Sequence, residues 1–339
     1  MHWIVAPSNP RESHHTWLPH FAPEDCGHTF ETVAATYDHD RSRASTSLGQ
    51  WGDYFGQARA VLAAARRHRG PVGIITVFPQ LAMAVGLLKR LTLSRVPVIA
   101  YYFNTGALGS RIKRRVATLG LGGIDRFVLT THLEIPAYAT ALGLPETRFA
   151  FAPFTVRREV RSLKVDEDAP FVVAMGSHHR DYATLCEALR GFPGNATIVA
   201  GPHATEGLDL PDNVTVRSGL PLVECHALAQ RARINVVPLD GAAMGAGTVT
   251  IVEAMMFGAA VIATNANGAD DYVADGTTGI LTPLRDAAAL RRTLDALWTD
   301  EPRRTALGNA AANAVTDEFS HEAGARRLIE ICNSFEPPR

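Results

Sequence analysis

Residues 234–264 read INVVPLDGAAMGAGTVTIVEAMMFGAAVIAT, and this stretch decides the fold class. It opens with an apolar run at Ile234–Pro238, passes through a glycine-rich segment, takes a helical period over Val249–Phe257 and ends in a second apolar run at Ala260–Thr264. Apolar strands joined by a helix are typical of a parallel sheet that helices cover on both faces. The stretch therefore predicts one β-α-β unit of an α/β protein.

The same alternation extends along the rest of the chain. Further candidate strands are Trp3–Ala6, Ile74–Val77, Val96–Tyr102, Arg126–Leu129, Phe149–Ala152, Phe171–Met175, Ala196–Ala200, Val214–Arg217 and Gly279–Thr282. Further candidate helices are Gly52–Arg67, Leu81–Arg90, Leu133–Leu142, Tyr182–Arg190, Leu222–Arg231, Ala287–Trp298 and Pro302–Glu318. The apolar segment Pro71–Leu88 is interrupted by Pro79 and Gln80, which favours a buried strand followed by a helix over a membrane span.

A polar stretch near the middle of the chain predicts a domain boundary. Thr155–Ala169 reads TVRREVRSLKVDEDA and has no hydrophobic period, as expected of a linker. A chain of 339 residues also exceeds what one core usually supports. We therefore expect an N-terminal domain over residues 1–155, a linker over 156–169 and a C-terminal domain over 170–318.

Composition excludes some function classes. The 33 Lys and Arg residues against 34 Asp and Glu residues leave a net charge of −1, so no overall field attracts nucleic acid or an anionic membrane. Cys26, Cys186, Cys225 and Cys332 lie far apart, as expected of reduced thiols in a cytoplasmic protein. The N-terminus lacks the pattern of a secretory signal. Gly120-Leu-Gly-Gly precedes a strand instead of following one, which argues against a dinucleotide-binding fingerprint.

The glycine-rich segment before the helix at Val249–Phe257 predicts an anion site. A helix N-terminus offers unpaired N–H groups and about half a positive charge, so Gly247-Thr-Val-Thr250 can bind a nucleotide diphosphate. Glu253 follows on the same helix face, where its carboxylate can accept hydrogen bonds from ribose hydroxyls. The alternative is a plain helix cap with a surface glutamate.

Residues 245–281 closely resemble the donor-binding signature of the retaining GT-B glycosyltransferases, the superfamily of glycogen and sucrose synthases. The matching features are Gly245-Ala-Gly, Glu253, the strand at Ala260–Thr264, Gly268 and Asp275-Gly-Thr-Thr-Gly279. The resemblance implies two Rossmann-like parallel-sheet domains that face each other across a cleft, with the acceptor on the first and the donor on the second. It also implies that residues 319–339 form a last helix that crosses back to the first domain.

The resemblance assigns roles to particular residues. It implies that Glu253 contacts the ribose and that Arg180, at the position of the family's phosphate-binding Lys, neutralises the leaving group, so these two are the predicted catalytic residues. The alternative for Arg180 is a surface pair with Asp181 or Glu187. The predicted donor-binding residues are Gly176, Ser177, Gly201, Gly219, Leu220, Gly245, Ala246, Gly247, Thr248, Val249 and Thr250.

Two departures from the family pattern concern the sugar and the phosphate. Gly245 stands where the family has the first Glu of a Glu-x7-Glu pair, which contacts the donor sugar, so sugar selectivity and retention rest on the resemblance alone. Ser177 or His178 occupies the place of a second phosphate-binding residue, usually Arg. No covalent nucleophile is recognisable, as in the family, where the leaving diphosphate accepts the acceptor's proton.

Polar residues at strand ends are candidates for an acceptor site, and paired histidines are the candidates for a metal site. Asn9, His14 and Asn104 follow strands of the first domain, where open α/β sheets bind ligands, and turn formation is the alternative. Paired histidines such as His14-His15 cannot easily face one ion, and no carboxylate spacing completes a ligand set, so we expect no metal and no other cofactor.

The sequence thus predicts transfer from a nucleotide-sugar, most simply a UDP-sugar, to a glycan, a lipid-linked saccharide or a small molecule. A nucleotide-sugar epimerase and a non-catalytic binding subunit remain alternatives. The basic segments Lys89-Arg90 and Ser110–Arg115 allow peripheral contact with the inner face of a membrane, although a solvated helix face explains them equally well. Nucleic acid is not an expected partner.

Overall fold

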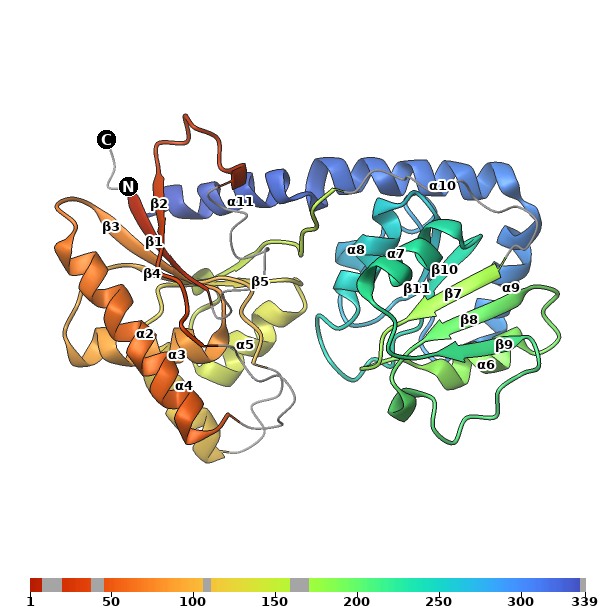
Figure 1. The fold of residues 1–339 in the computed structure, drawn as a ribbon, viewed down its shortest axis with the longest axis horizontal. Helices are drawn as coiled ribbons and strands as arrows, with labels where there is room; N and C mark the ends of the chain where they lie inside the picture. The colour runs from red at the N-terminus through yellow and green to blue at the C-terminus, as the bar shows by residue number, and fades with distance from the viewer. Residues whose placement is uncertain (8–19, 38–45, 106–110, 159–170, 336–339) are drawn as a thin grey trace. The chain divides into compact units, whose positions relative to one another are not determined.

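The computed structural model describes residues 1–7, 20–37, 46–105, 111–158 and 171–335, and for 111–114 and 116 only their backbone. The chain forms two compact units. Unit 1 comprises Met1–Ala152 together with Gly324–Arg339, and unit 2 comprises Pro153–Ala323. In Figure 1 the red-to-yellow segments and the last helix belong to unit 1, and the green-to-blue segments before that helix belong to unit 2.

Unit 1 is built on a six-stranded parallel sheet in the order β2-β1-β3-β4-β5-β6. The strands are β1 (His2–Ala6), β2 (Thr29–Thr32), β3 (Val72–Thr76), β4 (Val98–Ala100), β5 (Arg126–Leu129) and β6 (Phe149–Phe151). Register pairs Ile4 with Ile74 and Ile74 with Val98, so apolar side chains of neighbouring strands lie on the same face.

Helices cover both faces of this sheet. The helices of unit 1 are α2 (Leu48–Arg67), α3 (Pro79–Leu91), α4 (Arg111–Leu121), α5 (Glu134–Leu142) and α11 (His321–Asn333), and a 3₁₀ turn occupies Glu146–Arg148. Ile4 and Ile74 pack in one core with α2 and α3, whereas Trp3 and Ile99 pack on the other face with Leu328 of α11. This alternation explains why the central strands β3 and β4 are mostly apolar on both faces.

Unit 2 contains a second six-stranded parallel sheet, in the order β12-β11-β10-β7-β8-β9. Its strands are β7 (Phe171–Met175), β8 (Asn195–Val199), β9 (Val214–Arg217), β10 (Ile234–Val237), β11 (Ala260–Thr264) and β12 (Ile280–Thr282). Numbered within the unit, this is the Rossmann order 3-2-1-4-5-6.

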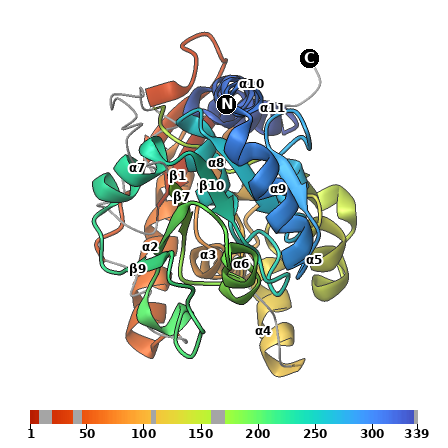
Figure 2. The same ribbon diagram turned by 90° about the vertical axis from the view of Figure 1, so that its right-hand side faces the viewer.

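The helices of unit 2 divide between the two faces of its sheet. They are α6 (Tyr182–Leu189), α7 (Leu222–Arg231), α8 (Thr248–Met256), α9 (Ala287–Thr299) and α10 (Glu301–Ala314), with 3₁₀ turns at Pro202–Ala204 and Ala269–Asp271 and a π-helical turn at Val315–Phe319. Val172 packs with α6 and α9, while Val173 packs with α7 on the opposite face. Figure 2 shows α6 and α9 on one side of β7 and α7 on the other.

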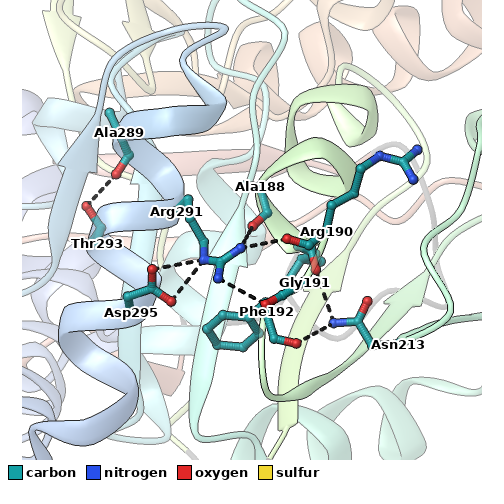
Figure 3. Close-up of polar contacts among 10 residues, drawn as sticks. Ala188, Arg190, Gly191, Phe192, Asn213, Ala289, Arg291, Thr293 and Asp295 are labelled. Carbon is teal, nitrogen blue, oxygen red and sulfur yellow. Dashed lines mark hydrogen bonds and ion pairs between the residues drawn. The ribbon is translucent and has the colours of Figure 1, made fainter.

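One arginine joins α9 to the end of α6. The Arg291 guanidinium donates to the carbonyl oxygens of Arg190 at 2.6 Å and Gly191 at 3.1 Å, and it pairs with Asp295 at 2.9 Å (Figure 3). It also lies 5.6 Å from the centroid of the Phe192 ring. These carbonyl groups directly follow α6, which ends at Leu189, so the guanidinium of Arg291 links the end of α6 to α9.

Most of the predicted elements are confirmed, with three differences. Strand β2 was not predicted because Thr29-Phe-Glu-Thr32 lies at the edge of the sheet and is mostly exposed. The helix α4 was not predicted, and the helix predicted over Pro302–Glu318 changes to a π-helical turn at Val315. Pro71–Leu88 forms the predicted strand and helix, and no described helix combines the length and apolar character needed to cross a bilayer.

Candidate functional site

The order of the unit 2 sheet marks the place where a ligand is expected. Strands β7 and β10 are neighbours, and the chain proceeds outward from them in opposite directions, through β8 and β9 on one side and β11 and β12 on the other. In open α/β sheets, ligands bind at the carboxyl ends of the strands at this switch point. The segments that follow β7 and β10 contain most of the predicted donor-binding residues.

These two segments are hydrogen-bonded to each other. The Asp181 N–H donates to the Pro238 carbonyl at 2.9 Å, and Arg180 and Leu239 form a short antiparallel bridge. His179 Nδ1 lies 3.4 Å from Asp240 Oδ2. The two loops therefore present their residues from one connected platform.

Helix α8 begins at this platform with its first turn open. Gly247 precedes it at φ +92°, a left-handed conformation that favours glycine, and a Cβ there would lie 2.4 Å from Leu239 Cδ2. No described side chain caps the first amides of α8. The N–H groups around Thr248 and Val249 are thus available to an anion, as the sequence pattern predicts.

The loop before α8 is held in place by its own hydrogen bonds. The Gly245 N–H donates to the Asn267 carbonyl at 2.9 Å, and the Thr248 hydroxyl donates to the Gly245 carbonyl at 3.2 Å. Gly245 has φ +70°, so a glutamate at this position would have a strained backbone. The glycine at 245, where the resemblance predicts a glutamate, therefore goes with a loop conformation that favours glycine.

Arg180 connects the loop after β7 to α8. Its Nη2 donates to the Thr250 hydroxyl at 2.9 Å, its Nε to the Met175 carbonyl at 3.0 Å and its Nη1 to the His178 carbonyl at 3.0 Å. Burial lowers the pKa of the guanidinium from its ordinary value, while the charges of Tyr182 and Asp240 act in the opposite direction. The group still remains a cation, because an arginine does not lose its proton in a protein.

The surface pair considered for Arg180 does not form. Asp181 instead caps α6 by accepting from the Thr184 N–H at 3.0 Å, and Glu187 pairs with Arg190 at 3.3 Å. Arg180 is therefore a partly buried cation beside the N-terminus of α8.

Ser177 links two of the predicted loops. Its Oγ accepts a hydrogen bond from the Gly201 N–H at 2.7 Å, and its carbonyl oxygen lies 3.2 Å from His203 Nε2. Gly176 has φ +116°, and a Cβ at this position would lie 2.7 Å from Arg180 Nη2. Glycine at 176 thus leaves space for the guanidinium, and Ser177 orders the loop around Gly201.

A pocket lies beside Glu253, between the sheet and the helices α7 and α8. Its lining comes from β7, β10, α7 and α8 and consists of Val173, Met175, Cys225, His226, Ala229, Asn235, Val236, Val237, Thr250, Glu253 and Ala254. The Glu253 side chain is 28 % exposed, and its Oε1 lies 3.7 Å from His226 Nε2. Gly219 and Leu220 precede α7, with Gly219 exposed at φ +67°. The structure therefore brings a carboxylate and an imidazole together at the pocket.

His226 was not recognised from the sequence. A single histidine within an apolar helix gives no signal of its own, and Glu253 is 27 positions away in the chain. Only the packing of α7 against α8 brings the two side chains into range.

Unit 1 has a separate polar cluster at the carboxyl ends of β4 and β5. Asn104 Nδ2 donates to Glu134 Oε1 at 3.5 Å, and the Tyr138 hydroxyl donates to Asn104 Oδ1 at 3.4 Å. Glu134 Oε2 also accepts from the Thr131 N–H at 3.0 Å. Burial raises the pKa of the Glu134 carboxyl, and hydrogen bonds from Thr131 and Thr130 oppose that rise. The sequence predicted Asn104 but not Glu134 or Tyr138.

The other predicted acceptor residues, Asn9 and His14, lie outside the described residues, in the loop that follows β1. The linker predicted at 156–169 and the segment Ser110–Arg115 are likewise only partly covered. Over the part of the chain that the structure describes, no group of three or more His, Cys, Asp or Glu side chains could hold a metal ion.

Comparison with known proteins finds one family model that matches most of unit 2. Residues 158–314 match the family model described as "Glycosyl transferases group 1". A D-inositol 3-phosphate glycosyltransferase from Corynebacterium urealyticum is 27 % identical over 237 residues, which are 66 % of this chain and 52 % of the relative. The Corynebacterium aurimucosum enzyme of the same name is 34 % identical over 33 % of this chain and 25 % of the relative. The chain thus spans about half or less of the length of these curated relatives.

Solved structures share the fold over nearly the whole chain. Sucrose-phosphate synthase from Thermosynechococcus elongatus matches with a TM-score of 0.71 and 18 % identity, over 98 % of this chain and 99 % of that chain. Anabaena Alr3699/HepE in complex with UDP also matches at 0.71, with 16 % identity over 99 % and 100 % of the two chains. The complex of Alr3699/HepE with UDP-glucose matches with a TM-score of 0.68 and 16 % identity, over 98 % of this chain and 100 % of that chain. The two-sheet architecture is the GT-B fold, and the predicted fold class is confirmed.

Proposed function

Because residues 158–314 match the family model of the group 1 glycosyltransferases, we propose that this chain transfers a sugar from a nucleotide-sugar donor to an acceptor hydroxyl group. The donor would bind to unit 2 at the carboxyl ends of β7 and β10. The acceptor would be a glycan, a lipid-linked saccharide or a small molecule bound to unit 1.

The observation that carries this proposal is the position of Arg180 beside the open N-terminus of α8. A nucleotide diphosphate is a dianion, and it needs both hydrogen-bond donors and positive charge when it leaves the sugar. Arg180 supplies a fixed guanidinium that donates to Thr250 at 2.9 Å, and Gly247–Val249 supply main-chain N–H groups. An arginine and a helix N-terminus together form a site suited to phosphate oxygens.

UDP is the first nucleotide to test. Alr3699/HepE, which shares the fold, has been solved with UDP and with UDP-glucose, and this supports a uridine donor for the present chain. Glu253 would accept hydrogen bonds from the ribose hydroxyls, and the main chain around Gly219 and Leu220 would contact the base. The identity of the sugar is not part of the proposal, because Gly245 provides no side chain to contact it.

The proposed reaction retains the configuration at the anomeric carbon and uses no metal. The bond between the anomeric carbon and the β-phosphate oxygen breaks, and the acceptor oxygen bonds to that carbon from the same face. The acceptor proton passes to an oxygen of the leaving diphosphate. Arg180 and the N-terminus of α8 stabilise the charge that develops on the leaving group.

Unit 1 would also contact a membrane surface from the cytoplasmic side, where lipid-linked acceptors are available. Leu91, Leu93 and Leu119 are 70 %, 88 % and 56 % exposed, and Arg90 donates to the Leu119 carbonyl at 2.9 Å, which places them near one another. The sequence predicted that Lys89 and Arg90 could both contact the membrane. Lys89, however, is buried and paired with Asp125. Sedimentation with anionic vesicles, compared between the wild type and Leu93→Ser, tests this contact.

Two rivals predict different products. An epimerase would isomerise the donor sugar with no acceptor present, and a non-catalytic subunit would bind the donor without cleaving it. The proposal requires slow donor hydrolysis without acceptor and release of the nucleoside diphosphate.

The test is a panel of UDP-, GDP- and ADP-sugars, with calorimetry for binding and chromatography for the released nucleotide and sugar. We expect binding and hydrolysis with one nucleotide family and the same rates in EDTA as in Mg²⁺. Absence of binding to every member would refute the proposal. Binding without turnover, with or without candidate acceptors, would favour the non-catalytic subunit, and an isomerised donor would favour the epimerase.

A further inference from the structure

We propose that His226 is a positioning residue for Glu253, which it holds in the orientation that binds the donor's ribose hydroxyls. The inference rests on the proposed function, because it concerns the same nucleotide site. It adds a residue on α7 that determines how strongly the protein distinguishes a ribonucleotide from a nucleotide without the ribose diol.

The two side chains face each other across the contact between α7 and α8. His226 Nε2 lies 3.7 Å from Glu253 Oε1, and the two side chains are 13 % and 28 % exposed. A contact between polar side chains that is partly shielded from water is less weakened by solvent and salt than one on the surface. The imidazole can therefore bias the carboxylate toward one conformation.

The imidazole is itself fixed in place. Its ring meets the Phe257 ring edge-on, with centroids 5.2 Å apart and planes at 62°. Phe257 lies one helical turn beyond Glu253 and is 1 % exposed, so it belongs to the packed core of unit 2. A glutamate otherwise loses side-chain entropy when it binds a ligand, and a fixed partner removes part of that cost before binding.

The other polar groups of the pocket are engaged elsewhere or are poor acceptors. Asn235 Nδ2 donates to the Ala229 carbonyl at 3.1 Å, and the Thr250 hydroxyl accepts from Arg180. Burial and the nearby charge of Glu253 raise the pKa of the Cys225 thiol, which keeps it protonated. Among the described lining residues, Glu253 is the one carboxylate.

A carboxylate with one oxygen toward His226 retains its second oxygen as an acceptor. Two adjacent hydroxyl groups are the donor pair that such a group binds best, because both can donate to one carboxylate. The ribose of a nucleoside diphosphate offers such a diol between the base and the phosphates, and the phosphates would lie at the N-terminus of α8. Glu253 follows that N-terminus by two helical turns at most.

A purely structural role for His226 would be to hold α7 against α8. Both roles predict that replacing His226 lowers stability, so stability does not separate them. The ribose diol does separate them, because only the positioning role acts through it.

The experiment measures the affinities of UDP and 2′,3′-dideoxy-UDP for the full chain by calorimetry. The proteins are the wild type, His226→Ala, His226→Gln, Glu253→Ala and the His226→Ala/Glu253→Ala double variant. Cys225→Ala is the matched control, because Cys225 precedes His226 and lines the same pocket. Thermal unfolding of each variant shows that it is folded, and His226→Gln, which keeps an N–H donor, replaces His226→Ala if the latter is not.

We expect His226→Ala to weaken UDP binding about tenfold and dideoxy-UDP binding less than twofold, because the lost orientation of Glu253 matters only where the diol is present. His226→Gln should recover part of the loss, and the double variant should bind UDP no more weakly than Glu253→Ala alone. Cys225→Ala should change both affinities equally.

Equal weakening of both ligands by His226→Ala, or no weakening of either, would overturn the positioning role while the proposed function stands. A wild type that binds UDP and dideoxy-UDP equally well would overturn the role of the ribose diol. A wild type that binds neither these nor the guanosine and adenosine diphosphates would overturn the proposed function itself.

Discussion

Both units contain a six-stranded parallel sheet, but their described polar clusters lie at different places relative to the point where strand order reverses. In unit 2 the reversal falls between β7 and β10, and the loops that follow these strands contain Arg180 and Gly247. In unit 1 it falls between β1 and β3, and the polar cluster around Glu134 lies farther along the sheet, beyond β4 and β5.

The difference follows from the chemistry of the two proposed ligands. A diphosphate requires main-chain N–H groups at a helix N-terminus and a nearby cation, and both leave a pattern of glycines and an arginine in the sequence. An acceptor hydroxyl is neutral and can be bound by separate polar side chains from several loops, which form no pattern. The sequence of unit 2 therefore predicts both a fold and a candidate site, whereas the sequence of unit 1 predicts mainly a fold.

The largest effect that would test this contrast is expected from Arg180→Ala. The substitution removes the cation that would stabilise the leaving diphosphate, so we expect kcat to fall by about 10²–10³-fold. Arg180→Lys keeps the charge but loses the contacts of the guanidinium to Met175, His178 and Thr250. Its kcat should therefore lie between that of the wild type and that of Arg180→Ala. Steady-state kinetics with saturating donor measures both.

Arg190→Ala is the matched control for charge and domain, because Arg190 is exposed and pairs with Asp209 at 2.6 Å on the same unit. It should leave kcat within twofold of the wild type. If Arg180→Ala also left kcat within twofold of the wild type, the leaving group would be stabilised by main-chain groups alone. Arg180 would then have no role in the proposed diphosphate site of unit 2.

A smaller effect is expected from Gly247→Ala, which tests the N-terminus of α8. The new methyl group would meet Leu239 Cδ2 at 2.4 Å, and the backbone at φ +92° is unfavourable for alanine. Gly276→Ala is the matched control, because φ is +74° there and nothing lies within 4 Å of the added Cβ. Both variants should lose about 1–2 kcal/mol of stability from the left-handed backbone.

Only Gly247→Ala should also weaken the binding of UDP, by about tenfold, because it displaces the first turn of α8 from the phosphates. Calorimetry and thermal unfolding give the two quantities separately. Equal UDP affinities in the two glycine variants would show that the diphosphate does not depend on this helix N-terminus.

The residues that the sequence could predict are those whose role depends on near neighbours in the chain. The β10-α8-β11 unit was predicted because its strands are apolar throughout and its helix follows a glycine loop, and Gly247 and Glu253 are six positions apart. Strand β2 was missed because its edge position leaves Thr29 and Glu31 exposed. Its four residues therefore lack an apolar run.

The residues that the sequence could not predict depend on contacts between distant segments. His226 acquires its place only when α7 packs beside α8, and Asn104 meets Glu134 across a separation of 30 residues. In neither pair does the spacing or the type of the residues distinguish them, in the sequence, from ordinary surface residues. Tertiary packing alone determines them, so they become visible only in the structure.

The smallest effect concerns Glu134 and tests whether the cluster of unit 1 is built around a buried charge. Burial raises the pKa of this carboxyl in the folded state above its unfolded value. The folded state therefore binds the proton more tightly, and the stability that Glu134 contributes is complete below the unfolded pKa and is lost as the pH rises through the folded pKa. Glu134→Gln cannot ionise, so its stability should not show this loss.

We therefore expect the stability of the wild type to fall relative to Glu134→Gln as the pH rises above the ordinary pKa of a glutamate. Thermal unfolding at a series of pH values should show this as a Tm of the wild type that falls, relative to that of Glu134→Gln, toward higher pH. Glu146→Gln is the matched control, because Glu146 is exposed in the same unit, and its profile should follow that of the wild type. A Glu134→Gln profile parallel to the wild type would mean that the hydrogen bonds from Thr130 and Thr131 fully offset burial. Glu134 would then be a helix-capping carboxylate, and unit 1 would have no buried titrating group at the ends of β4 and β5.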